Sequence, residues 1–305
     1  MSGPRILDPA DSEVIRAVVH ELRGGGVVAI PTETVYGLAG MTTNPGAIER
    51  IYTLKRRPLG NPLIAHVSEV ADVHQLIASG SWNEKAEHLA KHFWPGALTL
   101  IFPRGESVPS VATGGRDSIA VRCPSHPVAR LVCAHVGAAV SAPSANRSGA
   151  VSPTCAEHVA EEFSDSDLMI LDGGSAQIGL ESTVLDIRDP EHVQILRPGS
   201  ITRAQVESVV GSVEVISTEV QGDSPGTLSS HYAPRTPVHL VGSAQAVTSH
   251  DVFIRFASVA AVGDCLLDIH LGTNVEVASR RLYAALREAD TVNAQRICIE
   301  QPPAR

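Results

Sequence analysis

The sequence predicts a mixed α/β fold, in which a twisted sheet is flanked by helices and followed by a linker and a smaller α/β unit. Its 305 residues exceed one small domain of roughly 150 residues and suit two. Hydrophobic residues make up 43% and charged residues 19%, which excludes a disordered chain. Helical patterns alternate with short apolar runs in no strict order, which favours a mixed sheet.

Helices are predicted where apolar residues recur at helical spacing. From Ser12 to Arg23 this spacing is clear, with Asp11 or Ser12 as the cap and three glycines after it. Asn44 and Pro45 predict a cap and a first-turn proline for a helix that reaches about Leu54. The same criteria predict helices over residues 82–93, 127–136, 155–163 and 202–210.

Strands are predicted where short apolar runs end at turn residues. The run 27–30 lies between the glycine triplet and Pro31, and this pattern is typical of a buried strand. Residues 183–187 and 193–197 are separated by Arg188-Asp189-Pro190 and predict a hairpin. Further strands are predicted over residues 62–67, 98–102, 119–122, 138–141 and 168–172.

The composition changes after residue 210. Residues 211–237 are rich in Ser, Gly, Thr and Pro, which predicts a linker. Beyond it we expect four strands and one helix, which divides the chain into a first domain (1–210), a linker (211–237) and a small second domain (238–305). These strands are 238–241, 252–256, 265–269 and 297–299, and the helix is 275–287.

Charge and cysteine content exclude some classes of protein. The formal charge is −9, and residues 1–207 carry 17 Lys and Arg against 23 Asp and Glu. Neither part of the chain has the basic excess of a domain that grips nucleic acid by its phosphates. Five cysteines without close pairs indicate reduced thiols. We expect a soluble, cytoplasmic protein without membrane contact, because there is no apolar signal region and no apolar run near 20 residues.

The usual nucleotide and hydrolase signatures do not occur. There is no G-x-x-x-x-G-K-S/T loop, no G-x-G-x-x-G after a strand and no G-x-S-x-G. Four other polar segments stand out instead. The first is Pro31-Thr32-Glu33-Thr34-Val35-Tyr36-Gly37-Leu38, whose two hydroxyls and carboxylate follow a buried strand and suit a small polar ligand.

The second segment runs from Lys55-Arg56-Arg57 to Asn61-Pro62 and His66. Cations at the end of a helix can satisfy its dipole. In an acidic protein, however, three cations followed by two prolines that fix the backbone favour a polyphosphate clamp, because Arg offers a forked donor and Lys a point charge.

The third segment is Ser141-Ala142-Pro143-Ser144-Ala145-Asn146-Arg147-Ser148-Gly149, which extends to Ser152. Its small residues let a ligand approach the backbone, and its hydroxyls can bind phosphate or sugar oxygens. The fourth segment combines Glu181-Ser182-Thr183-Val184 with Arg197-Pro198-Gly199. Arg197 closes a predicted strand, a common place for a charge that faces a ligand.

Together these segments resemble the threonylcarbamoyl-AMP synthase family, whose catalytic domain has the YrdC-like fold. The motifs P-T-E-T-V-Y-G-L, K-R-R-P-x-x-N-P-L-I-x-H, F-W-P-G-x-L-T, A-V-R, S-A-P-S-A-N-x-S-G, E-S-T-V and R-P-G occur in the order of the family. Ser224-Pro225-Gly226 through His231-Tyr232-Ala233-Pro234 resembles the linker of two-domain members. The resemblance is strong over residues 10–235 and weak beyond, where it implies a small Rossmann-like domain.

The resemblance implies an enzyme that converts L-threonine, bicarbonate and ATP, with Mg²⁺, into threonylcarbamoyl-AMP and pyrophosphate. A partner enzyme then transfers the group to an adenosine beside the tRNA anticodon, and any direct tRNA contact of this chain would be weak. The residues implied around threonine are Thr34, His66, Arg122, Ala142 and Ser182. Those implied around ATP are Lys55, Arg57, Asn61, Thr113, Ser144, Asn146, Ser152 and Arg197, with Tyr232 closing the site from the linker.

Several points stay open at this level. His66 and Glu33 are both candidates for a general base, and no metal ligand is singled out. The chain stops where two-domain relatives usually continue, so we expect a shortened second domain whose role is open. Two other functions remain as alternatives: a carbamoyltransferase of the same fold that uses carbamoyl phosphate, and a non-catalytic module that binds double-stranded RNA or tRNA.

Overall fold

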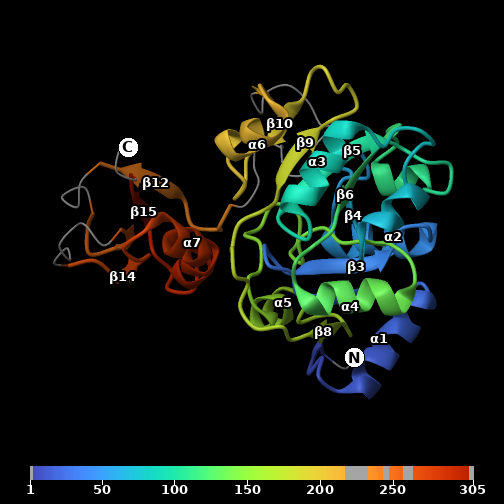
Figure 1. The fold of residues 1–305 in the computed structure, drawn as a ribbon. Coiled ribbons are helices and arrows are strands. Elements are labelled where there is room, and N and C mark those ends of the chain that lie inside the picture. Colours follow the sequence, from blue (N-terminus) through green and yellow to red (C-terminus); the bar gives the residue numbers. More distant parts are fainter. Residues whose placement is uncertain (1–2, 217–232, 243–246, 257–263, 302–305) are drawn as a thin grey trace.

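The protein folds into a larger and a smaller α/β body, which lie side by side in Figure 1. The structure is a computed structural model, and it describes residues 3–216, 233–242, 247–256 and 264–301. Part of the predicted linker, including the motif residues 224–226 and 231–232, therefore lies outside the described residues. The predicted fold class, a mixed sheet flanked by helices with a small α/β unit after it, is confirmed.

The larger body is built on one mixed sheet. β4 pairs in parallel with β6, whereas β6 and β5 are antiparallel, and β5 is again parallel to β9. Within the described residues the strand order is β1 (Arg5–Leu7), β8 (Met169–Leu171), β2 (Val28–Ile30), β3 (Gly37–Met41), β7 (Val140–Ser141), β4 (Ile64–His66), β6 (Ser118–Arg122), β5 (Leu98–Pro103), β9 (Thr183–Asp186), β10 (Gln194–Arg197) and β11 (Glu214–Val215).

Helices cover both faces of this sheet. On β2, Val28 and Ile30 pack with α1 (Ser12–Arg23) and α4 (Pro127–Val136), whereas Ala29 belongs to the apolar cluster of the opposite face. This alternation follows from the two-residue period of a strand. The opposite face is covered by α2 (Pro45–Lys55), α3 (Glu84–Phe93), α5 (Ala156–Glu162) and α6 (Arg203–Val210), and the short 3₁₀ turns are η1 (Val70–Gln75) and η2 (Ser110–Thr113).

The helix caps follow the chemistry that the sequence predicts. Asp11 accepts a hydrogen bond from Glu13 N and caps α1, and Asn44 accepts from Ala47 N ahead of Pro45 and caps α2. These bonds satisfy backbone N–H groups that the first turn leaves without partners. The cap residues therefore explain why both helices begin where the sequence predicts.

The smaller body is a parallel sheet with the strand order β12 (Val238–Val241), β15 (Arg296–Glu300), β13 (Asp251–Arg255) and β14 (Leu267–His270), next to α7 (Val275–Ala289). All of its strand pairs are parallel, as in Rossmann-like domains. It docks on loops of the larger body, because Val35 and Val151 belong to its apolar cluster. Arg287 Nη2 donates to Val151 O at 2.6 Å across this contact.

Three strands were missed by the sequence reasoning. β1 is a short edge strand, and β11 lies at the start of the predicted linker, where it pairs in parallel with β10. β3 contains Gly37 and Gly40, which do not favour a strand by themselves. Their small size matters here, because a Cβ at Gly37 would lie 3.0 Å from the Cβ of Ala142.

Candidate active site

A cavity lies at one edge of the larger sheet, where several strands and loops end. It is lined by Thr32, Thr34, Val35, Gly37, Arg57, Ile64, His66, Arg122, Ala142, Pro143, Ser144, Glu181, Ser182 and Arg197. All five residues predicted for threonine line it, as do three of those predicted for ATP: Arg57, Ser144 and Arg197. Segments far apart in the sequence therefore share one cavity, although its ligands remain a prediction.

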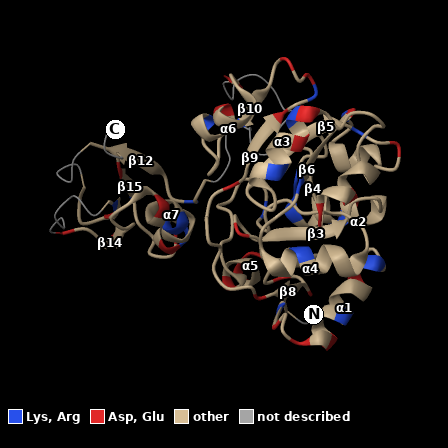
Figure 2. Cartoon of the chain, in the orientation of Figure 1, with Lys and Arg blue, Asp and Glu red and all other residues tan. Residues whose placement is uncertain are grey.

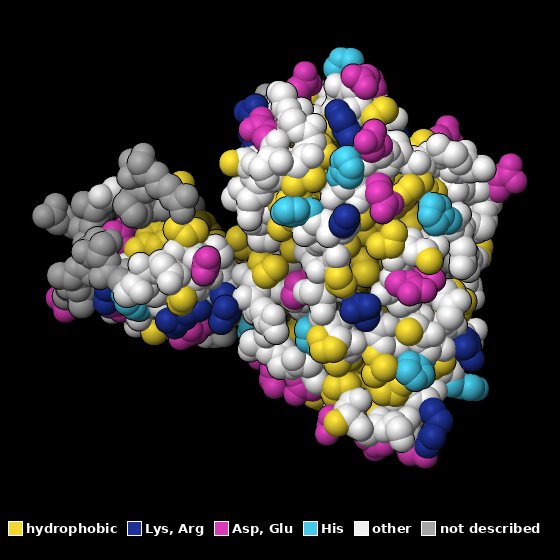
Figure 3. All heavy atoms as spheres, viewed as in Figure 1, with side chains coloured by type: hydrophobic (Ala, Val, Ile, Leu, Met, Phe, Trp, Pro, Cys, Tyr) yellow, Lys and Arg dark blue, Asp and Glu magenta, His cyan; other side chains and the backbone are white. Residues whose placement is uncertain are grey.

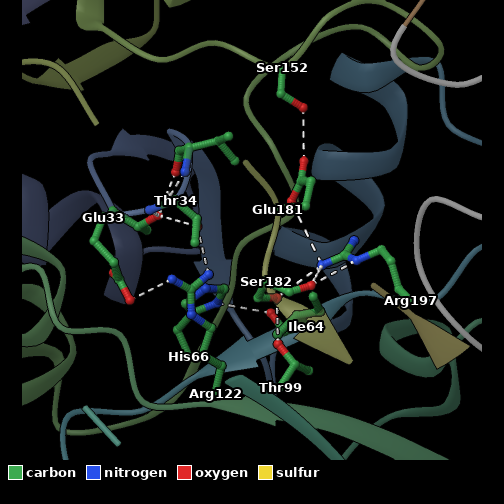
Figure 4. Close-up of polar contacts among 12 residues, drawn as sticks. Glu33, Thr34, Ile64, His66, Thr99, Arg122, Ser152, Glu181, Ser182 and Arg197 are labelled. Carbon is green, nitrogen blue, oxygen red and sulfur yellow. Dashed lines mark hydrogen bonds and ion pairs between the residues drawn. The ribbon is translucent and has the colours of Figure 1, made fainter. Parts of the chain in front are cut away.

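On one side of the cavity, a buried ion pair joins Arg122 at the end of β6 to Glu33 after β2 (Figure 4). Arg122 Nη2 lies 2.7 Å from Glu33 Oε1, and the two residues are 3% and 2% exposed. Arg122 also donates from Nε to Gly96 O at 3.1 Å and from Nη1 to Thr34 Oγ1 at 2.8 Å. Arg122 Nη2 is buried, and no hydrogen bond to a described residue uses its N–H groups. A guanidinium can bind one carboxylate through two adjacent N–H groups.

The charge of Glu33 is set by two opposing effects. Burial alone raises the pKa of this carboxyl, but the charge and hydrogen bond of Arg122 outweigh it and lower the pKa from 4.5 to about 2. Glu33 is therefore ionised at neutral pH and balances the charge of Arg122. A carboxylate with so low a pKa is a weak base.

His66, at the end of β4, is neutral for a similar reason. Burial, and then the charge of Arg122, lower the pKa of His66 from 6.5 to about 3. Its Nδ1 lies 3.2 Å from Ile64 O, and a carbonyl oxygen can only accept, so Nδ1 carries the proton. Nε2 is then an acceptor. Neither His66 nor Glu33 has a pKa near 7, so neither stands out as the general base.

On the other side, main-chain and amide oxygens orient Arg57. Arg56 ends α2 in the left-handed conformation, with φ of 50°. Arg57 then donates from Nε to Asn61 O at 3.1 Å, and from Nη2 to Asn61 Oδ1 at 2.6 Å and Pro62 O at 2.9 Å. Asn61 does not line the cavity but holds a residue that does.

Lys55 is buried behind the cavity rather than on its wall. It is the last residue of α2, is 1% exposed, and donates from Nζ to Ser144 O and Asn146 O, both at 2.5 Å. Burial is the main reason that the pKa of Lys55 lies well below its usual value. This ammonium therefore ties α2 to the loop that carries Ser144.

Arg197 at the end of β10 lies against Ser182 (Figure 4). Its Nε and Nη2 donate to Ser182 O at 3.0 and 2.9 Å, and Nη2 also donates to Ser182 Oγ at 2.9 Å. Glu181 accepts from Ser152 Oγ at 2.8 Å, and its other oxygen lies 3.8 Å from Arg197. Ser152 therefore does not line the cavity but contacts Glu181, which does.

Besides Lys55, Asn61 and Ser152, three further predicted residues are not placed on the cavity wall. Thr113 Oγ1 contacts Ser110 O and Arg116 O, and Asn146 Nδ2 donates to Arg147 O and Ala150 O, so both side chains hold their own loops. Tyr232 lies outside the described residues. The cavity also contains residues that were not singled out as ligands: Thr32, Val35, Gly37, Ile64, Pro143 and Glu181. All six belong to the motifs quoted from the sequence, although none of them was predicted as a ligand.

Among the described residues, no group of three or more His, Cys, Asp or Glu side chains could hold a metal ion. Within those same residues, no helix combines the length and apolar character needed to cross a membrane.

Family models match almost the whole chain. The model described as "Telomere recombination" matches residues 20–199, and the model described as "Threonylcarbamoyl-AMP synthase, C-terminal domain" matches residues 201–305. A threonylcarbamoyl-AMP synthase of Pyrococcus abyssi is 39% identical over 303 residues, which cover 94% of this chain and 88% of that protein. One of Bacillus subtilis is 45% identical over 237 residues, covering 76% of this chain and 67% of that protein.

A solved structure of a related protein is also similar to this chain over nearly its whole length. The crystal structure of P. abyssi Sua5 complexed with L-threonine matches with a TM-score of 0.86 and 34% identity. The match covers 99% of this chain and 92% of that chain. The likeness therefore includes the smaller body as well as the larger one.

Proposed function

Because the chain belongs to the threonylcarbamoyl-AMP synthase family, we propose that its cavity binds L-threonine beside ATP and makes threonylcarbamoyl-AMP from them with bicarbonate. The observation that carries this proposal is the meeting of two kinds of arginine in one cavity. Arg122 is balanced by Glu33 at 2.7 Å, whereas carbonyl oxygens accept hydrogen bonds from Arg57 and Arg197, and the carboxylate of Glu181 lies farther from Arg197, at 3.8 Å.

The Arg122 side suits an amino acid. N–H groups of Arg122 would bind the substrate carboxylate, and the neutral Nε2 of His66 would accept a hydrogen bond from a donor of the substrate. Burial of both side chains excludes water and strengthens each polar contact. With Glu33 ionised, Arg122 and a zwitterionic amino acid leave this half of the cavity uncharged.

The reaction needs positioning more than acid–base help. The unprotonated threonine nitrogen forms a bond to the carbon of bicarbonate, which loses hydroxide, and the nitrogen loses a proton to give a carbamate. A carbamate oxygen then attacks the α-phosphate of ATP, and the bond to pyrophosphate breaks. Arg57 and Arg197 would neutralise charge on the leaving pyrophosphate, as in phosphoryl transfer generally.

Mg²⁺ is the expected companion of ATP. This ion usually keeps several waters and binds one or two carboxylates together with substrate phosphates. Glu181 is a carboxylate on the cavity wall, next to Ser152 and Arg197, so the donor set fits an ion that arrives with the nucleotide. Once bound, Mg²⁺ would supply further neutralisation of phosphate charge.

No feature of the described residues favours the RNA-binding alternative. Lys and Arg are mixed with Asp and Glu along both bodies (Figure 2), and the face in Figure 3 shows the same mixture on its surface. A domain that grips RNA by its phosphates gathers basic residues on one face. We propose that a separate enzyme transfers the product to tRNA, and that the protein acts in the cytoplasm.

The decisive test is pyrophosphate release from ATP, measured with and without L-threonine and bicarbonate. We expect release to require both co-substrates. Release that ignores them would overturn the proposal. Carbamoyl phosphate in place of bicarbonate tests the carbamoyltransferase alternative, and a tRNA mobility shift independent of ATP and threonine would favour the RNA-binding module.

A further inference from the structure

Ser182 occupies the point at which the two halves of the cavity meet. It lines the cavity, is 1% exposed, and immediately precedes β9. Arg197 contacts it from the nucleotide side, and Thr99 of β5 contacts it from within the sheet, with 2.7 Å between the two hydroxyl oxygens (Figure 4). Thr99 is 0% exposed and does not line the cavity.

The directions of these hydrogen bonds follow from counting protons. A guanidinium can only donate, so Ser182 Oγ accepts from Arg197. Between Ser182 and Thr99 either hydroxyl could donate. If Ser182 donated, the proton of Thr99 would lack an acceptor among the described residues, and a buried donor without a partner is costly. Thr99 is therefore the donor, and Ser182 Oγ accepts twice.

A hydroxyl has two acceptor sites and one proton. With both acceptor sites of Ser182 occupied, only its proton remains for a ligand in the cavity. Ser182 can then donate to an oxygen of a carboxylate, carbamate or carbonyl group, but it cannot accept from an ammonium group. The same hydroxyl is bonded to Arg197, so anything that orders Arg197 also orders Ser182.

We propose that Thr99 is a positioning residue that makes Ser182 a hydrogen-bond donor toward the amino-acid substrate and, with Arg197, links binding of the two substrates. The inference rests on the proposed function, because it takes the two ligands to be L-threonine and ATP. Linkage of this kind is reciprocal: each ligand strengthens binding of the other by the same factor.

Substitutions of Thr99 can distinguish the loss of its hydroxyl group from a disturbance of the packing around it. Thr99→Val keeps the shape of the side chain and removes the hydroxyl, whereas Thr99→Ser keeps the hydroxyl. Thr99→Ala removes the hydroxyl without adding a methyl group, and it serves if the valine variant does not fold. The matched control is Thr42→Val, because Thr42 is also 0% exposed and pairs with one hydroxyl, that of Ser141 at 3.1 Å, away from the cavity lining.

The measurement is calorimetric titration with L-threonine, with and without a saturating non-hydrolysable ATP analogue, and the reverse titration. In the wild type we expect each ligand to strengthen binding of the other by at least about fivefold. Thr99→Val or Thr99→Ala should reduce this factor below about twofold and weaken threonine binding by about tenfold. Thr99→Ser and Thr42→Val should keep the wild-type factor.

The outcomes that overturn the inference are distinct from those that overturn the function. A folded Thr99→Val protein with undiminished linkage would refute the inference alone, as would a wild type that binds both ligands independently. If Thr42→Val lowered threonine affinity and the linkage factor as much as Thr99→Val, the effect would be a general one of removing a buried hydroxyl. That result would also refute the inference. A wild type that binds neither ligand and releases no pyrophosphate would instead refute the proposed function.

Discussion

The two halves of the cavity hold their arginines in different ways. Arg122 is paired with the buried carboxylate of Glu33 at 2.7 Å. Arg57 is oriented by oxygens of Asn61 and Pro62, and Arg197 lies 3.8 Å from the carboxylate of Glu181. Carbonyl oxygens orient a guanidinium without cancelling its charge, whereas a carboxylate at 2.7 Å balances it.

This difference matches the charges of the proposed ligands. A zwitterionic amino acid carries no net charge, so its carboxylate needs a hydrogen-bond donor but its site needs no net positive charge. The Glu33–Arg122 pair supplies the donor while its own charges balance. A triphosphate needs positive charge, which the guanidinium groups of Arg57 and Arg197 bring to this half of the cavity.

The largest effect is expected when Arg122 is replaced. Arg122→Gln removes two charge-assisted hydrogen bonds to the substrate carboxylate, each worth about 1.5–3 kcal/mol, so kcat/KM for threonine should fall roughly a thousandfold. The apparent KM for ATP should change little. Steady-state pyrophosphate release at varied threonine measures this.

The control for Arg122→Gln is the double variant with Glu33→Gln. Removing one partner of a buried ion pair costs about 3–5 kcal/mol of stability, and removing both restores most of it. Threonine use should nevertheless remain poor in the double variant. A threonine KM for Arg122→Gln within about threefold of wild type would show that the carboxylate binds elsewhere.

A smaller loss of activity is expected when Arg57 is replaced, in the half of the cavity that is proposed to bind ATP. Arg57→Ala should raise the apparent KM for ATP by about 50-fold, because one guanidinium contact to phosphate is lost, and should leave the KM for threonine unchanged. Lys85→Ala is the control, since Lys85 lies on the surface of α3. Equal effects of the two substitutions on ATP use would contradict the polyphosphate role.

The ion pair also predicts an acid-dependent loss of stability. Burial raises the pKa of Glu33, but Arg122 brings it to about 2 against an ordinary value of 4.5. The resulting stabilisation is present above pH 4.5 and is lost as the pH falls toward 2. Two to three pKa units correspond to about 3 kcal/mol.

Denaturant unfolding of wild type and Glu33→Gln between pH 2 and 7 measures this loss. The variant should be less stable at neutral pH and should approach the wild type toward pH 2. Parallel pH dependences for the two proteins would mean that Glu33 is not charged in the folded state.

The smallest effect concerns His66, for which no titration is expected near neutral pH. Burial and then Arg122 lower the pKa of His66 to about 3, so it stays neutral between pH 5.5 and 8. His66→Asn should lower kcat/KM for threonine without changing the shape of its pH profile. An inflection near pH 6.5 in the wild type that disappears in the variant would disprove this.

A helix could be predicted from the sequence where the residues that determine its length and its ends all lie within one segment. α1 and α4 begin and end at the predicted residues, because apolar spacing, cap residues and terminal glycines lie within each segment. β3 was missed for the opposite reason. Its glycine-rich residues become a strand only because β2 and β7 lie on either side and leave room for no larger side chain at Gly37.

The order of the motifs was enough to indicate the family and to select most of the cavity residues, because clusters of polar and charged residues can be recognised in the sequence. It could not tell which cations face the cavity. Lys55 and Arg57 are two residues apart, yet the ammonium points to the carbonyls of Ser144 and Asn146 while the guanidinium lines the cavity.

The sequence by itself therefore determined most of the helices and strands, the family and the types of side chain available. Tertiary structure decided the pairings, such as Glu33 with Arg122 and Thr99 with Ser182, which are 89 and 83 residues apart. The physical reason is that hydrogen bonds and ion pairs act over about 3 Å. Only the pairing of β5 with β9, and the folding of β2 and β6 into the same sheet, bring such distant residues within that range.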